Sequence, residues 1–328
     1  MRPFDYQRPD SLENSTQMTS ADTAMAIAGG TNLLDLMKLQ VETPDALVDI
    51  NRLGMADIVD TSDGGLRIGA LATNTATAVH PRVRREYPVL ARAILAGATQ
   101  QLRNKATTGG NLCQRTRCYY FTNIDQPCNK RDPGSGCGAI DGVARLHAVL
   151  GTSDQCIATY PGDMAVAMSA LDATVEIASA GESTRSVPVR DFHRLPGDEP
   201  WRDNVLESGE IITAVVLPPP VEGTQLYRKV RERSSYAFAL VSIAAIVAMD
   251  GDTIMRADLA FGGLAHKPWH DPRLSDLLVG SCPSATLFDE AADLLLEDAQ
   301  GYGENDFKIP LARRTLAAVL AEATGAEL

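Results

Sequence analysis

The chain has 328 residues, 45% of them hydrophobic and 22% charged, and a formal net charge of −12 at pH 7. Such a composition is typical of a globular protein, and the length allows two or three domains that each bury a core. The acidic balance disfavours nucleic acid as a partner, because it repels phosphates and no long basic stretch offsets it. No apolar run approaches the ~20 residues that cross a bilayer, so we expect a soluble chain without membrane insertion.

The amino-terminal segment bears on the cellular compartment. Residues 1–14 include charged side chains and no continuous apolar stretch of the kind found in signal peptides. We therefore expect no export signal of the chain's own. The chain is predicted to be cytoplasmic, or periplasmic by export together with a partner that carries a signal.

The first hundred residues predict two α/β units. The first is a βαβ unit, with a strand at 24–28, a Gly29-Gly30 turn, a helix at 32–40 capped by Thr31 or Asn32, and a strand at 46–50. The second unit has a strand at 66–71, a helix entered at Thr73 or Asn74, and a longer helix at 87–102.

The rest of the chain predicts a long irregular segment followed by more regular structure. Residues 103–160 have no sustained helical or strand period, and a loop of this length usually has a function. Beyond it we predict a helix at 163–171, a strand at 173–177 and a connector at 188–201. Strands at 211–217, 225–230, 237–249 and 255–261 precede helices near 285–298 and 311–324, which indicates an α+β domain. The predicted domains are 1–58, 59–200 and 201–328.

Two glycine pairs suggest an anionic ligand. Ala28-Gly29-Gly30-Thr31-Asn32 lies between a predicted strand and helix, where backbone N–H groups and the helix dipole favour a diphosphate. It lacks the three-glycine spacing of the Rossmann fingerprint. Thr107-Thr108-Gly109-Gly110-Asn111 is a second element of the same kind. Each alone could be a tight turn, but together they favour ligand binding.

Clustered cysteines suggest a metal centre rather than disulfides. Of six cysteines, four lie between Cys113 and Cys137, and Cys156 follows. The cations among them would suit a thiolate-bound four-iron cluster, which is anionic; they are Arg115, Arg117, Lys130 and Arg131. Zinc is the main alternative, although structural zinc sites usually use cysteines two to four residues apart and none are so spaced here. Unligated thiols are a further alternative.

The sequence resembles the FAD-binding subunits and domains of the xanthine dehydrogenase and aldehyde oxidoreductase family over nearly its whole length. The resemblance is carried by Ala28 to Leu34 with Met37-Lys38, Ile68 to Thr73, Ala106 to Asn111, and Ser234 to Ala237 ahead of Leu240-Val241-Ser242. It implies an α+β fold: a two-part FAD-binding domain of the PCMH type, with a small βαβ subdomain and a larger α/β subdomain, followed by a carbon monoxide dehydrogenase flavoprotein-type C-terminal α+β domain.

The resemblance also implies the FAD site. The loop expected to hold the FAD pyrophosphate comprises Ile27, Ala28, Gly29, Gly30, Thr31, Asn32 and Leu33. Thr107, Thr108, Gly110 and Asn111 should lie along the pyrophosphate, ribityl chain and flavin. Asp163 matches an aspartate that binds the ribityl chain, and Gly162 stands where the family usually has serine. Lys229 could approach the flavin from the last domain, where a cation would favour the anionic reduced form.

The cysteine insertion, at about 112–160, is similar to the [4Fe–4S] segment of periplasmic bacterial aldehyde oxidoreductases. The similarity runs through residues 115–121, 126–131, 133–137 and 153–159. It implies Cys118, Cys128, Cys137 and Cys156 as cluster ligands. Cys113 could replace Cys156 if the loop folds differently, and the distant Cys282 is expected to be structural.

The resemblance implies an electron-transfer subunit with no catalytic residue for the organic substrate. A large molybdopterin-binding subunit would oxidise an aldehyde, a small subunit with [2Fe–2S] clusters would relay electrons, and FAD would reduce an external acceptor. The three chains would form a heterotrimer. A self-sufficient FAD oxidase and a zinc-stabilised binding module without redox activity are the alternatives.

Overall fold

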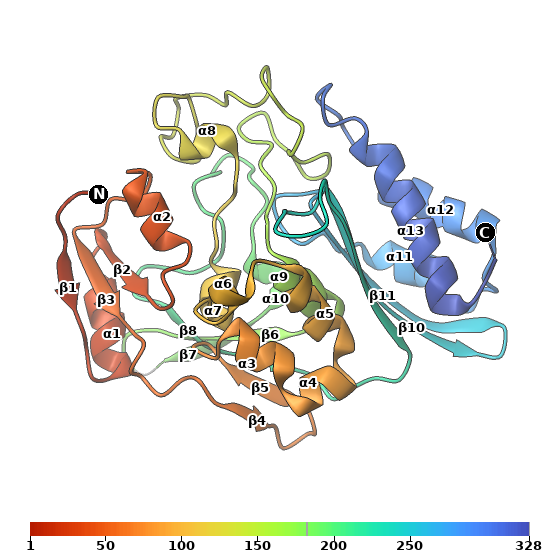
Figure 1. Ribbon diagram of the computed structural model, residues 1–328, viewed down its shortest axis with the longest axis horizontal. Helices are drawn as coiled ribbons and strands as arrows, with labels where there is room; N and C mark the ends of the chain where they lie inside the picture. Colours follow the sequence, from red (N-terminus) through yellow and green to blue (C-terminus); the bar gives the residue numbers. More distant parts are fainter. Residues whose placement is uncertain (182, 328) are drawn as a thin grey trace.

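A computed structural model describes residues 1–181 and 183–327, arranged around three β-sheets (Figure 1). The first sheet is small, parallel and ordered β1-β3-β2. Its elements are β1 (Asp5–Gln7), α1 (Leu12–Thr19), β2 (Ala24–Ile27), α2 (Leu33–Lys38) and β3 (Ala46–Asp49). The predicted βαβ unit is confirmed. Helix α2 is shorter than predicted because Gln40 takes a left-handed φ of 59°, which ends the helix. The sequence patterns did not indicate β1 or α1.

The second sheet has five antiparallel strands in the order β4-β5-β8-β6-β7. They are β4 (Ile58–Asp60), β5 (Leu66–Gly69), β6 (Thr174–Ala178), β7 (Thr184–Pro188) and β8 (Ile211–Leu217). Strand β8 was predicted to open the third domain, but Val215 pairs with Ile68 on one side and Val175 on the other. The expected boundary after residue 200 is therefore wrong, since the central strand of this sheet comes after it.

Short helices lie beside this second sheet. They are α3 (Asn74–Val79), α4 (Pro81–Glu86), α5 (Pro88–Ala96), α6 (Gln100–Arg103), α7 (Thr108–Leu112), α9 (Asp163–Ala170) and α10 (Val189–Phe192). Helices α7 and α10 contact its strands, and α3, α4, α5 and α9 share a hydrophobic core with it. The single helix predicted at 87–102 is divided into α5 and α6 because Gly97 is extended and Ala98 has a φ of 51°. Helix α3 begins as expected, with the Thr73 hydroxyl accepting the N–H of Ala76.

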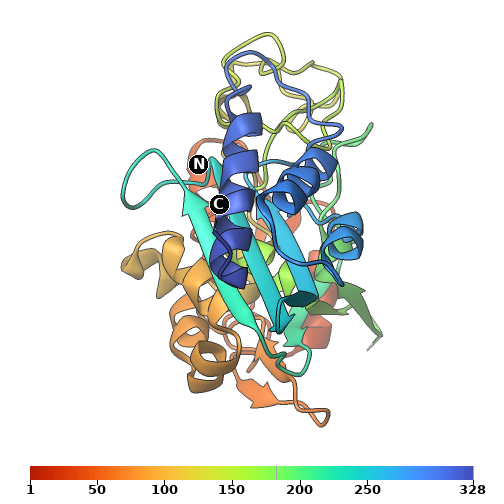
Figure 2. The same cartoon turned by 90° about the vertical axis from the view of Figure 1, so that its right-hand side faces the viewer.

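The third sheet is antiparallel, in the order β11-β10-β9, and is covered on both faces. Helices α11, α12 and α13 lie on its outer face, as Figure 2 shows, while α5 and α9 pack on the inner face. Successive side chains of β10 therefore point to opposite faces of the sheet. Ile243 and Ala245 lie in one hydrophobic core, and Ala244 and Ile246 lie in the other. The elements are β9 (Thr224–Val230), β10 (Val241–Asp250), β11 (Thr253–Gly262), α11 (Pro272–Leu278), α12 (Ala285–Leu295) and α13 (Lys308–Thr324).

Residues 113–162 form a largely irregular insertion at the top of Figure 1. Its regular features are α8 (Tyr119–Thr122) and an isolated bridge between Cys128 and Cys137. Side chains hold the loop together: Asn129 Oδ1 accepts the N–H groups of Gly134 and Gly136. Among the described residues, no helix combines the length and apolar character that crossing a bilayer requires.

Candidate cofactor sites

A cleft of about 630 Å³ lies where the three sheet units meet. We call it the cofactor cleft. Its walls come from the β2–α2 loop, the segment from α5 to α7, the start of α9, and β9 with the loop that follows it. Its volume is in the range of sites for small molecules and cofactors. The predicted FAD residues that line it are Ile27, Ala28, Gly29, Gly30, Thr31, Asn32, Leu33, Thr107, Gly110, Asn111, Asp163 and Lys229.

The first glycine loop packs closely against the backbone just before the second glycine loop. A Cβ added to Gly29 would lie 2.0 Å from the carbonyl oxygen of Lys105, so only glycine fits there. Gly30 has a φ of 71°, which turns the chain into α2. Asn32 occupies the N-cap position of α2 without a side-chain cap bond. Its Oδ1 instead accepts the N–H of Arg115 at 2.8 Å, which ties this loop to the insertion.

The second glycine loop forms the start of α7. Thr107 caps the helix, and its hydroxyl accepts the N–H of Gly110 at 3.3 Å. Thr108 was expected beside FAD but is fully buried behind the loop, where its hydroxyl donates to the carbonyl oxygen of Ala72 at 3.1 Å. The side chain of Thr108 therefore does not line the cofactor cleft, and its contact with FAD stays a prediction.

Asp163 and Lys229 both reach the cofactor cleft and form a buried ion pair. The Lys229 ammonium donates to Asp163 Oδ2 at 2.8 Å, and the Tyr227 hydroxyl donates to Asp163 Oδ1 at 2.6 Å. The side chain of Lys229 is 4% exposed and that of Asp163 is 8% exposed. Lys229 is therefore already paired with an anion. Each carboxylate oxygen keeps one further lone pair for a ligand hydroxyl.

Gly162 leaves space for an aromatic ring beside the cleft. A Cβ at this position would lie 2.5 Å from the ring of Tyr160, whose hydroxyl donates to the carbonyl oxygen of Asn111. Burial raises the pKa of Tyr160 far above its ordinary value. The glycine thus fits a neutral, hydrogen-bonded tyrosine that supports the second glycine loop.

The four cysteines assigned as ligands line a single cavity inside the insertion, which we call the cysteine cavity. Cys128 and Cys156 are buried, and burial raises the pKa of Cys156 to about 11. Cys118 also has its pKa raised by burial, to about 12. Cys113 lies instead on the wall of the cofactor cleft. This placement supports the choice of Cys156 over Cys113.

The ligand geometry bears on which metal could bind. Within residues 1–181 and 183–327, no group of three or more His, Cys, Asp or Glu side chains is placed to bind one metal ion together.

The two candidate sites are connected by a further cavity. A third cavity lies between the other two: it shares Cys118 and His147 with the cysteine cavity and Asp163 with the cofactor cleft. The two candidate sites are therefore neighbours.

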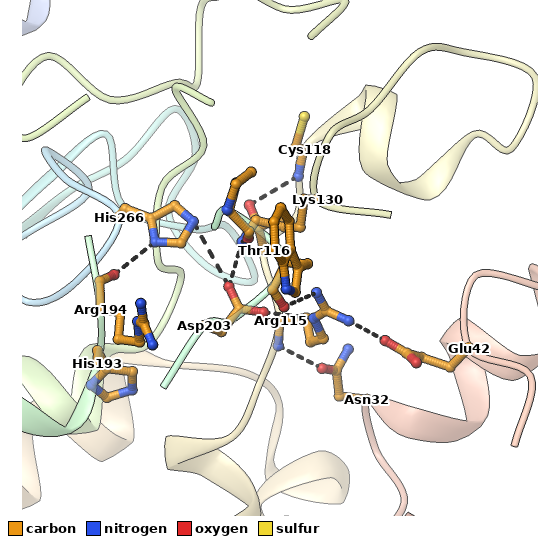
Figure 3. A network of polar contacts seen from close by, with 12 residues as sticks. Asn32, Glu42, Arg115, Thr116, Cys118, Lys130, His193, Arg194, Asp203 and His266 are labelled. Carbon is orange, nitrogen blue, oxygen red and sulfur yellow. Dashed lines mark hydrogen bonds and ion pairs between the residues drawn. The ribbon is translucent and has the colours of Figure 1, made fainter. Parts of the chain in front are cut away.

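A charged network between the two sites centres on Asp203 (Figure 3). Asp203 Oδ2 accepts from Arg115 at 2.6 Å and Oδ1 from Lys130 at 2.5 Å, while Arg115 also pairs with Glu42. Burial alone would raise the pKa of Asp203, but Lys130 and Arg115 hold it well below its usual range. Arg115 lines the cofactor cleft and Lys130 the cysteine cavity, so one carboxylate joins both walls.

Sequence reasoning identified Arg115 and Lys130 as cations suited to the cluster but missed their anionic partners. Glu42 follows α2, and Asp203 lies in the connection between α10 and β8, far from both cations in the chain. No local pattern marks either carboxylate. The side chains of Arg233, Tyr236 and Phe238 also line the cleft and were not predicted, although the family resemblance includes residues 234–237.

Two glycine loops, a helix start and a buried Asp–Lys pair around one cleft are features of a protein that binds an anionic cofactor. Residues 2–220 match the family model described as the FAD binding domain in molybdopterin dehydrogenase. Residues 225–323 match the CO dehydrogenase flavoprotein C-terminal domain. The chain belongs to this family of FAD-binding oxidoreductase subunits, and the predicted fold class is confirmed.

Individual relatives agree with the family assignment. The chain is 53% identical over 98% of its length to the aldehyde oxidoreductase FAD-binding subunit PaoB of Escherichia coli (strain K12), 99% of which is covered. It is 28% identical to the glyceraldehyde dehydrogenase medium chain of Sulfolobus acidocaldarius, over 84% of this chain and 81% of that one. The crystal structure of quinoline 2-oxidoreductase from Pseudomonas putida 86 superposes with a TM-score of 0.75 and 26% identity, covering 99% and 98% of the two chains.

Proposed function

We propose that this chain is the FAD- and [4Fe–4S]-binding electron-transfer subunit of a heterotrimeric, molybdenum-dependent aldehyde oxidoreductase. The observation that carries the proposal is the pair of neighbouring sites, one lined by the two glycine loops and the other by four cysteines. The relative with 53% identity, named an aldehyde oxidoreductase FAD-binding subunit, supports the substrate class. When bound, FAD would collect electrons from iron–sulfur centres and pass them to an external acceptor.

The residues of the cofactor cleft fit an FAD molecule in stated roles. The Ile27 to Leu33 loop would hold the pyrophosphate through its backbone N–H groups. Thr107, Gly110 and Asn111 would extend this polar wall. The free lone pairs of Asp163 would accept ribityl hydroxyls, and the Lys229 contact fixes the carboxylate that does so.

We expect a four-iron cluster rather than zinc in the cysteine cavity. In such a cluster each thiolate binds a different iron, so the four sulfurs surround the cluster instead of meeting at one ion. Cys118, Cys128, Cys137 and Cys156 share one cavity without three of them converging on a point. Lys130, on the same cavity wall, supplies positive charge near an anionic cluster. Unligated thiols are the other alternative, and the iron analysis below decides between the readings.

The partners follow from the names of the relatives. Two of them are called medium chains, one of a glyceraldehyde dehydrogenase and one of a carbon monoxide dehydrogenase. We therefore expect a large molybdopterin-binding subunit and a small [2Fe–2S] subunit to purify with this chain, with aldehyde oxidation on the large one. Flavin reduction by aldehyde in the isolated chain would favour the self-sufficient oxidase instead.

Cofactor analysis of the anaerobically purified complex tests the proposal. Flavin, iron, sulfide and zinc should be measured together with the visible spectrum, for the wild type and for Cys128→Ser. We expect flavin and four irons beyond those of the small subunit's [2Fe–2S] clusters, and loss of those four in the variant. Zinc without extra iron would refute the cluster, and absence of flavin would refute the whole assignment.

A further inference from the structure

One histidine of the insertion points at a proposed cluster ligand. The Nε2 atom of His147 lies 3.1 Å from the sulfur of Cys118. The imidazole is 2% exposed and lines the cysteine cavity, so water does not compete for this contact. Among the described residues, its other nitrogen, Nδ1, has no hydrogen-bond partner. The sulfur is therefore the one hydrogen-bond partner that the described residues give this ring.

The backbone of His147 is held from a different domain. Its carbonyl oxygen accepts from the Lys308 ammonium at 2.8 Å and from Asn305 Nδ2 at 3.4 Å. Lys308 also donates to the carbonyl oxygens of Leu146 and Gly263, and both Lys308 and Asn305 are fully buried. The start of α13 thus fixes the residue that carries the imidazole, although the insertion around it is irregular.

The direction of the hydrogen bond follows from the chemistry of the ligand. A cysteine bound to iron is a thiolate, which has no proton to donate. The sulfur can then only accept, so His147 must present Nε2–H to Cys118. A donor to a ligand sulfur stabilises the more negative, reduced form of a cluster, and hydrogen bonds to sulfurs are among the factors that set cluster potentials.

We propose that His147 is a positioning residue that donates a hydrogen bond to the Cys118 sulfur and thereby raises the reduction potential of the [4Fe–4S] cluster. This inference rests on the proposed function, because it requires the cluster. It goes beyond that function by naming the residue that makes the cluster easier to reduce, and so more able to exchange electrons with the neighbouring flavin.

Matched variants of the complex test the inference. His147→Leu removes the donor, whereas His147→Gln places an amide N–H within reach of the same sulfur. His270→Leu, in the last domain before α11, is the control for loss of a histidine. An EPR-monitored redox titration gives the potential, and iron content is measured on the same samples.

At the potential where half of the wild-type cluster is reduced, we expect the reduced-to-oxidised ratio in His147→Leu to fall about tenfold, equivalent to a 59 mV shift for one electron. His147→Gln should recover part of this change, and His270→Leu should show none. Four extra irons with an unchanged potential in His147→Leu would overturn the inference. Wild-type complex without the extra irons would instead mean that the proposed function fails.

A measurement on the wild type covers the case in which variants lose the cluster. Complex labelled with ¹⁵N-histidine should show a weak nitrogen hyperfine coupling to the reduced cluster, as expected across a hydrogen bond. No coupling would overturn the inference. A strong coupling would also overturn it, because it would make the histidine an iron ligand.

Discussion

Replacing Asp203 with asparagine should destabilise the protein strongly, because this carboxylate balances two buried cations. Lys130 is 1% exposed and would keep only the carbonyl oxygen of Pro200 as a close acceptor, while Arg115 would keep Glu42. Removing one partner of a buried ion pair typically costs about 3–5 kcal/mol. Since both cations retain one partner, we expect the lower end, about 3 kcal/mol, or roughly 6–12 °C in melting temperature.

The assay is thermal unfolding of the purified complex, with Asp198→Asn as the matched control. Asp198 lies in the same connection between α10 and β8 but is exposed, so its replacement should change stability by less than about 0.5 kcal/mol. The flavin should dissociate at the same lowered temperature, because Arg115 lines the cofactor cleft. Equal melting temperatures for Asp203→Asn and wild type would refute the reasoning.

The pH dependence of this difference provides a second check. Lys130 and Arg115 hold the pKa of Asp203 well below its usual range, although burial opposes them. A carboxyl whose folded pKa is lowered stabilises the protein above its unfolded pKa of about 3.9 and loses that contribution as pH falls through the folded pKa. The gap between wild type and Asp203→Asn should thus be full at pH 7 and narrow below about pH 4.

Three further predictions concern the glycine loop, the fifth cysteine and a buried lysine. Gly29→Ala should abolish flavin binding, because the new Cβ would meet the Lys105 carbonyl at 2.0 Å, whereas Gly54→Ala, with nothing within 4 Å, should retain flavin at a strain cost of about 1–2 kcal/mol; equal flavin content in both would contradict this. Cys113→Ser should keep the four extra irons and Cys156→Ser should lose them, and the reverse pattern in an iron assay would mean that Cys113 is the ligand. Lys308→Met should lower the free energy of unfolding by about 2–4 kcal/mol in denaturant titrations, because three carbonyl oxygens lose their buried donor; a change under 0.5 kcal/mol would contradict that role.

The parts of the site that the sequence predicted are those set by local chemistry. The Gly29-Gly30 pair turns the chain from β2 into α2, Gly109 and Gly110 lie in the first turn of α7, and residues of both loops line the cofactor cleft. Thr73 caps its helix as predicted, whereas α7, which Thr107 caps, was not predicted. The cysteines could be recognised as a set because thiols so clustered have few other uses.

The parts that the sequence did not predict depend on pairing between distant segments. Strand β8 looks like any apolar strand, and only its register with β5 and β6 places it in the second sheet. Thr108 differs from Thr107 only in which side of the turn it faces. Asp203 lies in a connector and gains its importance from two cations more than seventy residues away. None of these relations has a local signature.

X-ray diffraction from crystals of the anaerobic complex, recorded on both sides of the iron edge and of the zinc edge, tests the central claim most directly. The account predicts a cluster of iron scatterers bonded to Cys118, Cys128, Cys137 and Cys156, and separate dinucleotide density in the cofactor cleft along the Ile27 to Leu33 loop. A single zinc peak in the insertion, or a cleft without flavin density, would contradict it.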